Sequence, residues 1–154
     1  MLTNMVHHNH QRISKLESLH GKTFYICNKV FYTSCLDPGS DLTLPQGAIV
    51  GGDGNTKITQ LWTLLESPNN AGYYYMTSAV YPKSRIATNK DGVRFHNGPK
   101  YPDQLWKFEK IGINTYRIIN FHRKNEKLVM LPNGVVATSN KKDENDQIWT
   151  LLSV

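Results

Sequence analysis

A short segment in the second half of the chain gathers side chains that can hold a sugar. It runs Val93-Arg94-Phe95-His96-Asn97-Gly98 and continues to Tyr101 and Asp103. A sugar offers hydroxyl groups and an apolar ring face, so its site requires a fixed carboxylate or amide and an aromatic platform. An imidazole, a phenol ring and a carboxylate meet that need, and Arg94 suits a sialyl, sulfated or uronic sugar through a bidentate contact. An ordinary exposed hairpin loop is the alternative interpretation.

A second polar group, in the last third of the chain, is basic. It comprises His122, Arg123, Lys124 and Lys127. Such clusters are most often solvated, and we expect that here. If this cluster binds a ligand, the ligand is acidic and the binding weakens with salt.

Residue patterns that indicate catalysis or a metal are absent from the sequence. It contains no Gly-x-Ser-x-Gly, no His-Glu-x-x-His, no phosphate loop and no zinc-spaced cysteine pair. His7, His8 and His10 have no carboxylate or cysteine beside them, which favours a solvated tail. We therefore expect no enzyme activity, no cofactor and no metal site.

Composition limits the remaining classes. The 154 residues are 39% hydrophobic and 19% charged, which suits one globular domain, and the formal net charge is +6. No apolar run approaches the ~18 residues of a membrane span, and the polar N-terminus lacks a signal peptide, which favours cytoplasmic synthesis or non-classical secretion. No block of basic residues alternates with aromatic residues, so nucleic acid is an unlikely partner.

For Cys27 and Cys35 we expect two partly buried thiols, with a disulfide across a hairpin as the alternative.

Three tripeptides show that the chain is built from repeats. They are Gln60-Leu61-Trp62, Gln104-Leu105-Trp106 and Gln147-Ile148-Trp149, and they include all three tryptophans of the chain. Even spacing of this kind indicates units of roughly forty residues. The units run approximately over residues 21–66, 71–111 and 114–154, and residues 1–20 lie outside them. Ile13, Leu16 and Leu19 in that outer segment are spaced like one amphipathic turn that packs on the repeats.

The rest of each unit repeats as well. Each unit opens with an aromatic-rich strand: Phe24-Tyr25-Ile26, Tyr73-Tyr74-Tyr75-Met76 and Tyr116-Arg117-Ile118-Ile119. A step of eight residues from Asn28, Ser78 and Asn120 leads to predicted buried positions at Leu36, Ile86 and Leu128. A glycine turn follows in each: Pro45-Gln46-Gly47, Lys90-Asp91-Gly92 and Pro132-Asn133-Gly134. The next short strands are Ala48-Ile49-Val50, Val93-Arg94-Phe95 and Val135-Val136-Ala137. Each unit thus has four predicted strands.

Three four-strand units favour an all-β fold closed around one shared core, because closure removes exposed strand edges. With Gln-x-Trp near the end of each unit, the sequence over residues 21–154 resembles the ricin-B-type β-trefoil lectin family. The resemblance implies a β-trefoil of three pseudo-equivalent four-strand units. We expect the Trp side chains to fill the core and the Gln amides to hold turn backbone, rather than to contact sugar.

The family's sugar-site positions are preserved unevenly in this chain. In the first unit, Asp37 of Cys35-Leu36-Asp37 matches the acidic position, and Asp53 and Asn55 in the loop from Gly51 to Thr59 are further polar options. In the second unit Ala87 replaces the acid, His96 stands near the platform position, and Asp103 replaces the family's Asn. The third unit has Val129, Thr138 and Asp146 at these positions. The candidate carbohydrate-binding residues are Asp37, Asp53, Asn55, Arg94, His96, Asn97, Tyr101 and Asp103.

We therefore expect a non-catalytic carbohydrate-binding protein that uses loop sites on one or two units. The resemblance and the charge indicate glycans of acidic or galactose type as partners, with multivalency from the repeat or from a homodimer. The alternative is a β-trefoil interaction module, of inhibitor or scaffold type, that has lost sugar binding, because function in such a fold resides in its loops.

Overall fold

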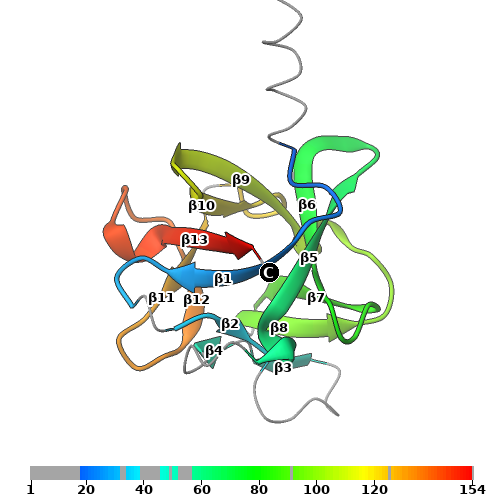
Figure 1. The fold of residues 1–154 in the computed structure, drawn as a ribbon, viewed down its shortest axis with the longest axis horizontal. Coiled ribbons are helices and arrows are strands. Elements are labelled where there is room, and N and C mark those ends of the chain that lie inside the picture. The colour runs from blue at the N-terminus through cyan, green and yellow to red at the C-terminus, as the bar shows by residue number, and fades with distance from the viewer. Residues whose placement is uncertain are drawn as a thin grey trace, which may run out of the picture.

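The computed structural model describes residues 18–31, 34–38, 46–48, 50–51, 57–90, 92–124 and 126–153. The structure has strands and short 3-10 turns in these ranges (Figure 1). Ile13, Leu16, His7, His8 and His10 lie outside the described residues.

Six long strands form a closed antiparallel ring. They are β1 (Thr23–Asn28), β5 (Leu61–Ser67), β6 (Asn70–Ser78), β9 (Leu105–Gly112), β10 (Thr115–Asn120) and β13 (Ile148–Ser153). In the order β1–β5–β6–β9–β10–β13 each strand pairs with the next, and β13 pairs with β1 again. Figure 1 shows the last strand lying beside the first. Closure leaves the ring without an open edge.

Three hairpins complete the fold, one inserted in each unit. They are β2 (Leu36–Asp37) with β4 (Val50–Gly51), β7 (Ser84–Asn89) with β8 (Gly92–Asn97), and β11 (Lys127–Met130) with β12 (Val136–Ser139). Each unit therefore supplies two ring strands and one hairpin. The predicted all-β fold of three four-strand units around a shared core is confirmed.

The first unit has one strand more than predicted. β3 (Gln46–Ala48) pairs with β8 of the second unit, with Gln46 opposite His96 and Ala48 opposite Arg94. The prediction of a turn at Pro45-Gln46-Gly47 is therefore wrong for Gln46 and Gly47, because a long-range strand pairing replaces the local turn. In the other two units the turn glycines, Gly92 and Gly134, have the positive φ that such turns need.

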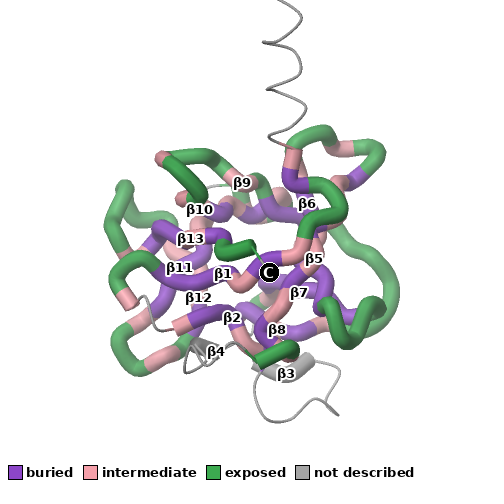
Figure 2. The backbone as a smooth tube through the Cα atoms, viewed as in Figure 1, coloured by how far each residue is buried: buried purple, intermediate pink, exposed green. Residues whose placement is uncertain are grey.

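The core is built from equivalent residues of the three units (Figure 2). The side chains of Trp62, Trp106 and Trp149 are fully buried, as are Leu36, Ile86 and Leu128, whose burial the sequence predicted. Each indole N–H donates to a carbonyl of the same unit: Trp62 to Leu36 at 3.0 Å, Trp106 to Ile86 at 2.9 Å and Trp149 to Leu128 at 2.9 Å. The Trp residues thus fill the core and fasten each hairpin to it.

Each fully buried Gln of the tripeptides ends a 3-10 turn. The turns are η1 (Ile58–Gln60), η2 (Pro102–Gln104) and η3 (Asn145–Gln147). The Nε2 atoms of Gln104 and Gln147 donate to the carbonyls of Pro99 and Lys141, as expected for a residue that holds turn backbone. Gln60 differs, because its Nε2 donates to the Asp37 carboxylate instead.

The two cysteines form a disulfide. Cys27 and Cys35 are bonded to each other, so the expectation of two free thiols is wrong. Their backbones form an isolated antiparallel bridge, which brings the two side chains together across the intervening turn. This is the alternative interpretation, a disulfide across a hairpin. Leu19, from the segment before the repeats, packs in the core.

Candidate functional site

The three junctions between consecutive units share one pattern of backbone hydrogen bonds. The N–H of Lys29 donates to Ile148 O at 2.8 Å, that of Ala79 to Leu61 O at 3.0 Å, and that of Phe121 to Leu105 O at 2.8 Å. The preceding residues, Asn28, Ser78 and Asn120, each accept two N–H groups of the following loop on the side-chain oxygen. The sequence repeat therefore reappears as three equivalent junctions with different side chains.

Asn120 ties the junction between the second and third units together. Its Oδ1 accepts the N–H groups of His122 at 3.0 Å and Arg123 at 2.9 Å. Its Nδ2 donates to the carbonyl of Asp103 at 3.0 Å. Because Asn120 is only 1% exposed, these bonds are shielded from water and fix one loop of the third unit against η2 of the second.

A hollow of about 330 Å³ opens at this junction. Its described lining residues are Thr88, Asn89, Lys90, Tyr101, Pro102, Asp103, His122 and Arg123. They come from three separate segments: the end of β7, the start of η2 and the loop after β10. The volume lies at the small end of the range for small-molecule sites.

Tyr101 and Asp103 give the hollow an aromatic surface and a carboxylate. Tyr101 is 50% exposed, and it packs edge-on against His96 with ring centroids 5.8 Å apart. The Oδ1 of Asp103 is buried and has no hydrogen-bond partner in the described part of the chain. An unpaired carboxylate oxygen is costly to bury, because it loses its hydrogen bonds to water.

Arg85 anchors the loop that carries Tyr101. Arg85 is 4% exposed, its Nε donates to Gln104 Oε1 at 2.8 Å, and its Nη2 donates to the carbonyl of Gly98. Gln104 in turn donates to the carbonyl of Pro99 at 3.0 Å. Burial lowers the pKa of Arg85, and its electrostatic interaction with Tyr75 acts in the opposite direction. The Cζ atom of Arg85 also lies over the Tyr75 ring, 5.9 Å from its centroid, in a cation–π contact.

The structure separates the predicted site residues into groups. Tyr101 and Asp103 share the hollow, and His96 contacts Tyr101 from outside it, with its Nε2 buried and unpaired within the described residues. Arg94 and Asn97 lie on β8 and do not line the hollow.

The first-unit candidates lie apart from this hollow. Asp37 accepts the Gln60 amide at 2.9 Å, which holds its carboxylate in one orientation. Asp53 and Asn55 lie outside the described residues.

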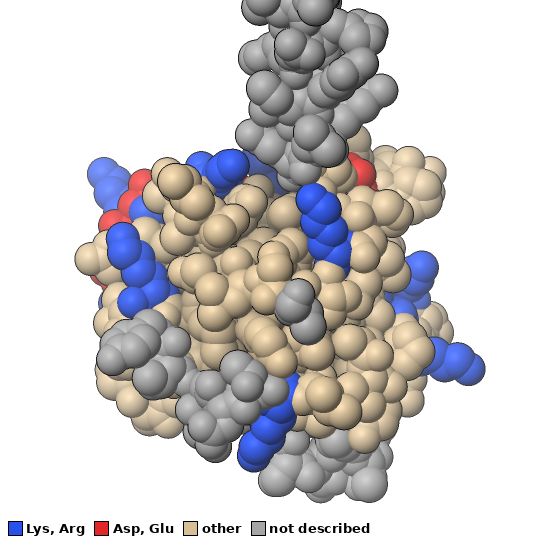
Figure 3. Space-filling model, viewed as in Figure 1, with Lys and Arg blue, Asp and Glu red and all other residues tan. Residues whose placement is uncertain are grey.

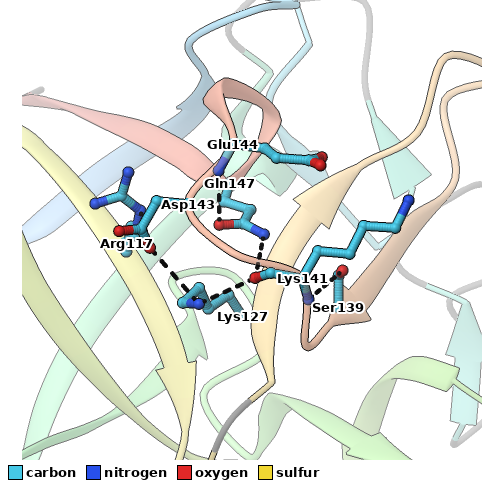
Figure 4. A network of polar contacts seen from close by, with 7 residues as sticks. All are labelled: Arg117, Lys127, Ser139, Lys141, Asp143, Glu144 and Gln147. Carbon is cyan, nitrogen blue, oxygen red and sulfur yellow. Dashed lines mark hydrogen bonds and ion pairs between the residues drawn. The ribbon is translucent and has the colours of Figure 1, made fainter.

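The third unit uses its polar side chains to hold its own loop (Figure 4). Asp143 Oδ1 lies 3.5 Å from Arg117 Nε and 3.7 Å from Lys127 Nζ, and Lys127 also donates to the carbonyl of Lys141 at 3.2 Å. Gln147 completes the network through the same carbonyl and through the N–H of Glu144. Figure 4 shows these groups converging on the loop before η3.

The predicted basic cluster is divided between two places. Lys127 joins the network of Figure 4, whereas His122 and Arg123 line the hollow. His122 and Lys124 are exposed, as expected for a solvated cluster, whereas Arg123 and Lys127 are half-buried and form ion pairs. The missed signal is the position of His122 and Arg123 two and three residues after Asn120, which the repeat equates with Asn28 and Ser78.

Charge is dispersed on the face drawn in Figure 3. Lys and Arg side chains lie apart around a mostly uncharged centre, with few acidic groups among them. Within the described ranges, no three His, Cys, Asp or Glu residues come together as metal ligands, and no helix is long and apolar enough to cross a membrane.

Comparison with known proteins places this architecture. No family model and no curated protein matches the sequence. Among solved structures, a designed three-fold symmetric protein, ThreeFoil, matches with a TM-score of 0.75 at 15% identity, over 86% of this chain and 99% of that chain. The chain has the β-trefoil fold.

Two other solved structures show this β-trefoil in natural proteins. A ricin B-like lectin from Macrolepiota procera, solved in complex with lactose, has a TM-score of 0.70 at 20% identity and covers 90% of this chain and 99% of that chain. A mosquitocidal holotoxin has a TM-score of 0.79 at 15% identity over 89% of this chain. This chain spans only 18% of the holotoxin's length. At these identities the likeness establishes the fold alone.

Proposed function

We propose that the protein is a non-catalytic carbohydrate-binding protein whose ligand occupies the hollow between its second and third units. The observation that carries the proposal is that a half-exposed Tyr101 and the partly exposed Asp103 line one hollow. A sugar ring stacks on an aromatic face, and its hydroxyl groups donate to a carboxylate.

The neighbouring contacts support this function by keeping the site in shape. Arg85 holds the loop before Tyr101, and Asn120 holds the loop that carries His122 and Arg123. Binding surfaces that are fixed before the ligand arrives lose less entropy on binding. The lactose complex of the similarly folded Macrolepiota procera lectin adds support at the level of fold.

The test is a glycan array followed by titration calorimetry with each glycan that binds. Tyr101→Ala is expected to weaken binding at least about tenfold, which corresponds to about 1.4 kcal/mol. Tyr81→Ala is the matched control, because Tyr81 is 40% exposed and also packs edge-on against a β8 ring, that of Phe95, but does not line the hollow. Its affinity is expected to stay at the wild-type value.

Two results would contradict the proposal. If no glycan binds, the proposed carbohydrate-binding function is wrong and the alternative, a protein-interaction module, is favoured. If glycans bind and Tyr81→Ala weakens them as much as Tyr101→Ala, the site lies elsewhere.

A further inference from the structure

The described lining residues of the hollow carry one more positive than negative charge, and Glu126, which pairs with Arg123, is not among them. Lys90 and Arg123 bring two cations to its wall, whereas Asp103 is the one carboxylate among its described lining residues. Lys90 is exposed and forms no ion pair with the described residues. The cations belong to different segments, so the excess charge is a property of the assembled junction and not of one basic stretch.

Arg123 is placed so that part of its guanidinium remains available. Its Nη1 lies 3.6 Å from Glu126 Oε2, and its side chain is 38% exposed. A guanidinium has five N–H donors, so one ion pair leaves donors for a second anion. The backbone N–H of Arg123 is bound by Asn120, which fixes where this side chain starts. Glu126 and Asn120 thus orient Arg123 at the edge of the hollow.

Asp103 adds one negative charge to the hollow. Its carboxylate repels an anionic group but accepts hydrogen bonds from sugar hydroxyls, and Tyr101 lines the same hollow. An acidic ligand therefore avoids electrostatic repulsion from Asp103 only if its charged group contacts Lys90 and Arg123 while a neutral sugar ring contacts Tyr101 and Asp103.

We propose that this hollow selects an acidic glycan, with a carboxylate or sulfate bound by Lys90 and Arg123 and the adjoining neutral sugar ring on Tyr101 and Asp103. The inference rests on the proposed function, since it names the ligand class of that same site. The net charge of +6 assists by raising the encounter rate with anions at low salt.

The experiment compares lactose with lactose that carries a terminal sialic acid or a sulfate, by titration calorimetry of the full chain. We expect the acidic glycans to bind at least about tenfold more tightly than lactose at about 50 mM salt, with the advantage shrinking at about 300 mM. Inorganic polyphosphate serves as a probe that has charge but no sugar ring.

Charge-removing variants locate the effect. Arg123→Gln and Lys90→Gln are each expected to lower affinity for the acidic glycans about five- to tenfold, which is more than either lowers affinity for lactose, so the ratio of the two affinities falls. Lys57→Gln is the matched control, because it removes one exposed charge from the start of η1 at a different junction. Circular dichroism of each variant confirms that the fold is intact.

The possible outcomes distinguish a failure of the acidic selectivity from a failure of the proposed carbohydrate-binding function. Equal affinity for neutral and acidic glycans, both lost in Tyr101→Ala, keeps the carbohydrate function and overturns the acidic selectivity. Polyphosphate binding as tight as that of the acidic glycans, unaffected by Tyr101→Ala, also overturns it, because bare charge then accounts for the signal. Binding to no glycan removes both proposals.

Discussion

The side-chain amide of Asn120 donates a 3.0 Å hydrogen bond to the backbone carbonyl of Asp103, across the junction of two trefoil units. The equivalent residue at the junction of the third and first units, Asn28, makes the same contact with Asp146 at 2.8 Å. At the remaining junction the equivalent residue is Ser78, which has no amide to donate but still accepts two loop N–H groups. The chain itself therefore shows how such a junction is built when Ser takes the place of Asn.

Asn120→Ser is expected to remove the bond to Asp103 while keeping an acceptor for the loop, as Ser78 does. The Asp103 carbonyl then loses a buried donor, so the free energy of unfolding should fall by about 1–2 kcal/mol in urea denaturation. Because Asn120 bonds to the backbone of two of the three segments that line the hollow, glycan affinity should fall as well.

Asn28→Ser is the control for that variant. It removes an equivalent bond at a junction whose residues do not line the hollow, so it should cost similar stability and leave glycan affinity unchanged. Equal loss of affinity in both variants would show that stability, and not the position of the walls, controls binding.

The shared core could be predicted from the sequence because its evidence is local and repeated. The burial of Leu36, Ile86 and Leu128 follows from their equal distances to the preceding Asn or Ser, and each carbonyl receives a Trp N–H in the structure. A single unit would not have sufficed, because one Gln-x-Trp has many explanations and three equally spaced ones have few.

The hollow could not be predicted in this way. The sequence identifies Tyr101 and Asp103 as candidates, but His122 and Arg123, which line the same hollow, belong to another unit, and nothing local to either segment indicates that the two meet. The pairing of β3 with β8 is equally non-local. The disulfide could not be predicted for a different reason, since the spacing of Cys27 and Cys35 suits both redox states.

Trp106→Phe tests the fastening of the second hairpin to the core. The substitution keeps a buried aromatic ring but removes the N–H that donates to Ile86 O at 2.9 Å. Leaving that carbonyl unsatisfied should lower the free energy of unfolding by about 1–3 kcal/mol. Urea denaturation followed by circular dichroism measures the change, and an unaltered midpoint would mean that water satisfies the carbonyl.

The Cys27–Cys35 disulfide closes a short loop, with a sequence separation of 8. Loop-closure entropy predicts that the double variant Cys27→Ser/Cys35→Ser loses about 2–3 kcal/mol of stability. Thiol titration of the denatured, unreduced protein should find no free cysteine before reductant is added and two afterwards. Two thiols before reduction would contradict the pairing.

Arg85→Lys should loosen the loop that carries Tyr101 without changing the charge. One ammonium group cannot reproduce the fork with which Arg85 reaches both Gln104 and the Gly98 carbonyl, so a loss of about 1–3 kcal/mol is expected in urea denaturation. Hydrogen exchange should rise over the loop before η2, and glycan affinity should fall. Arg117→Lys is the control, because its partner Asp143 has a 66% exposed side chain and such an ion pair contributes less than about 1 kcal/mol. Equally small losses in both variants would show that Arg85 does not anchor the loop.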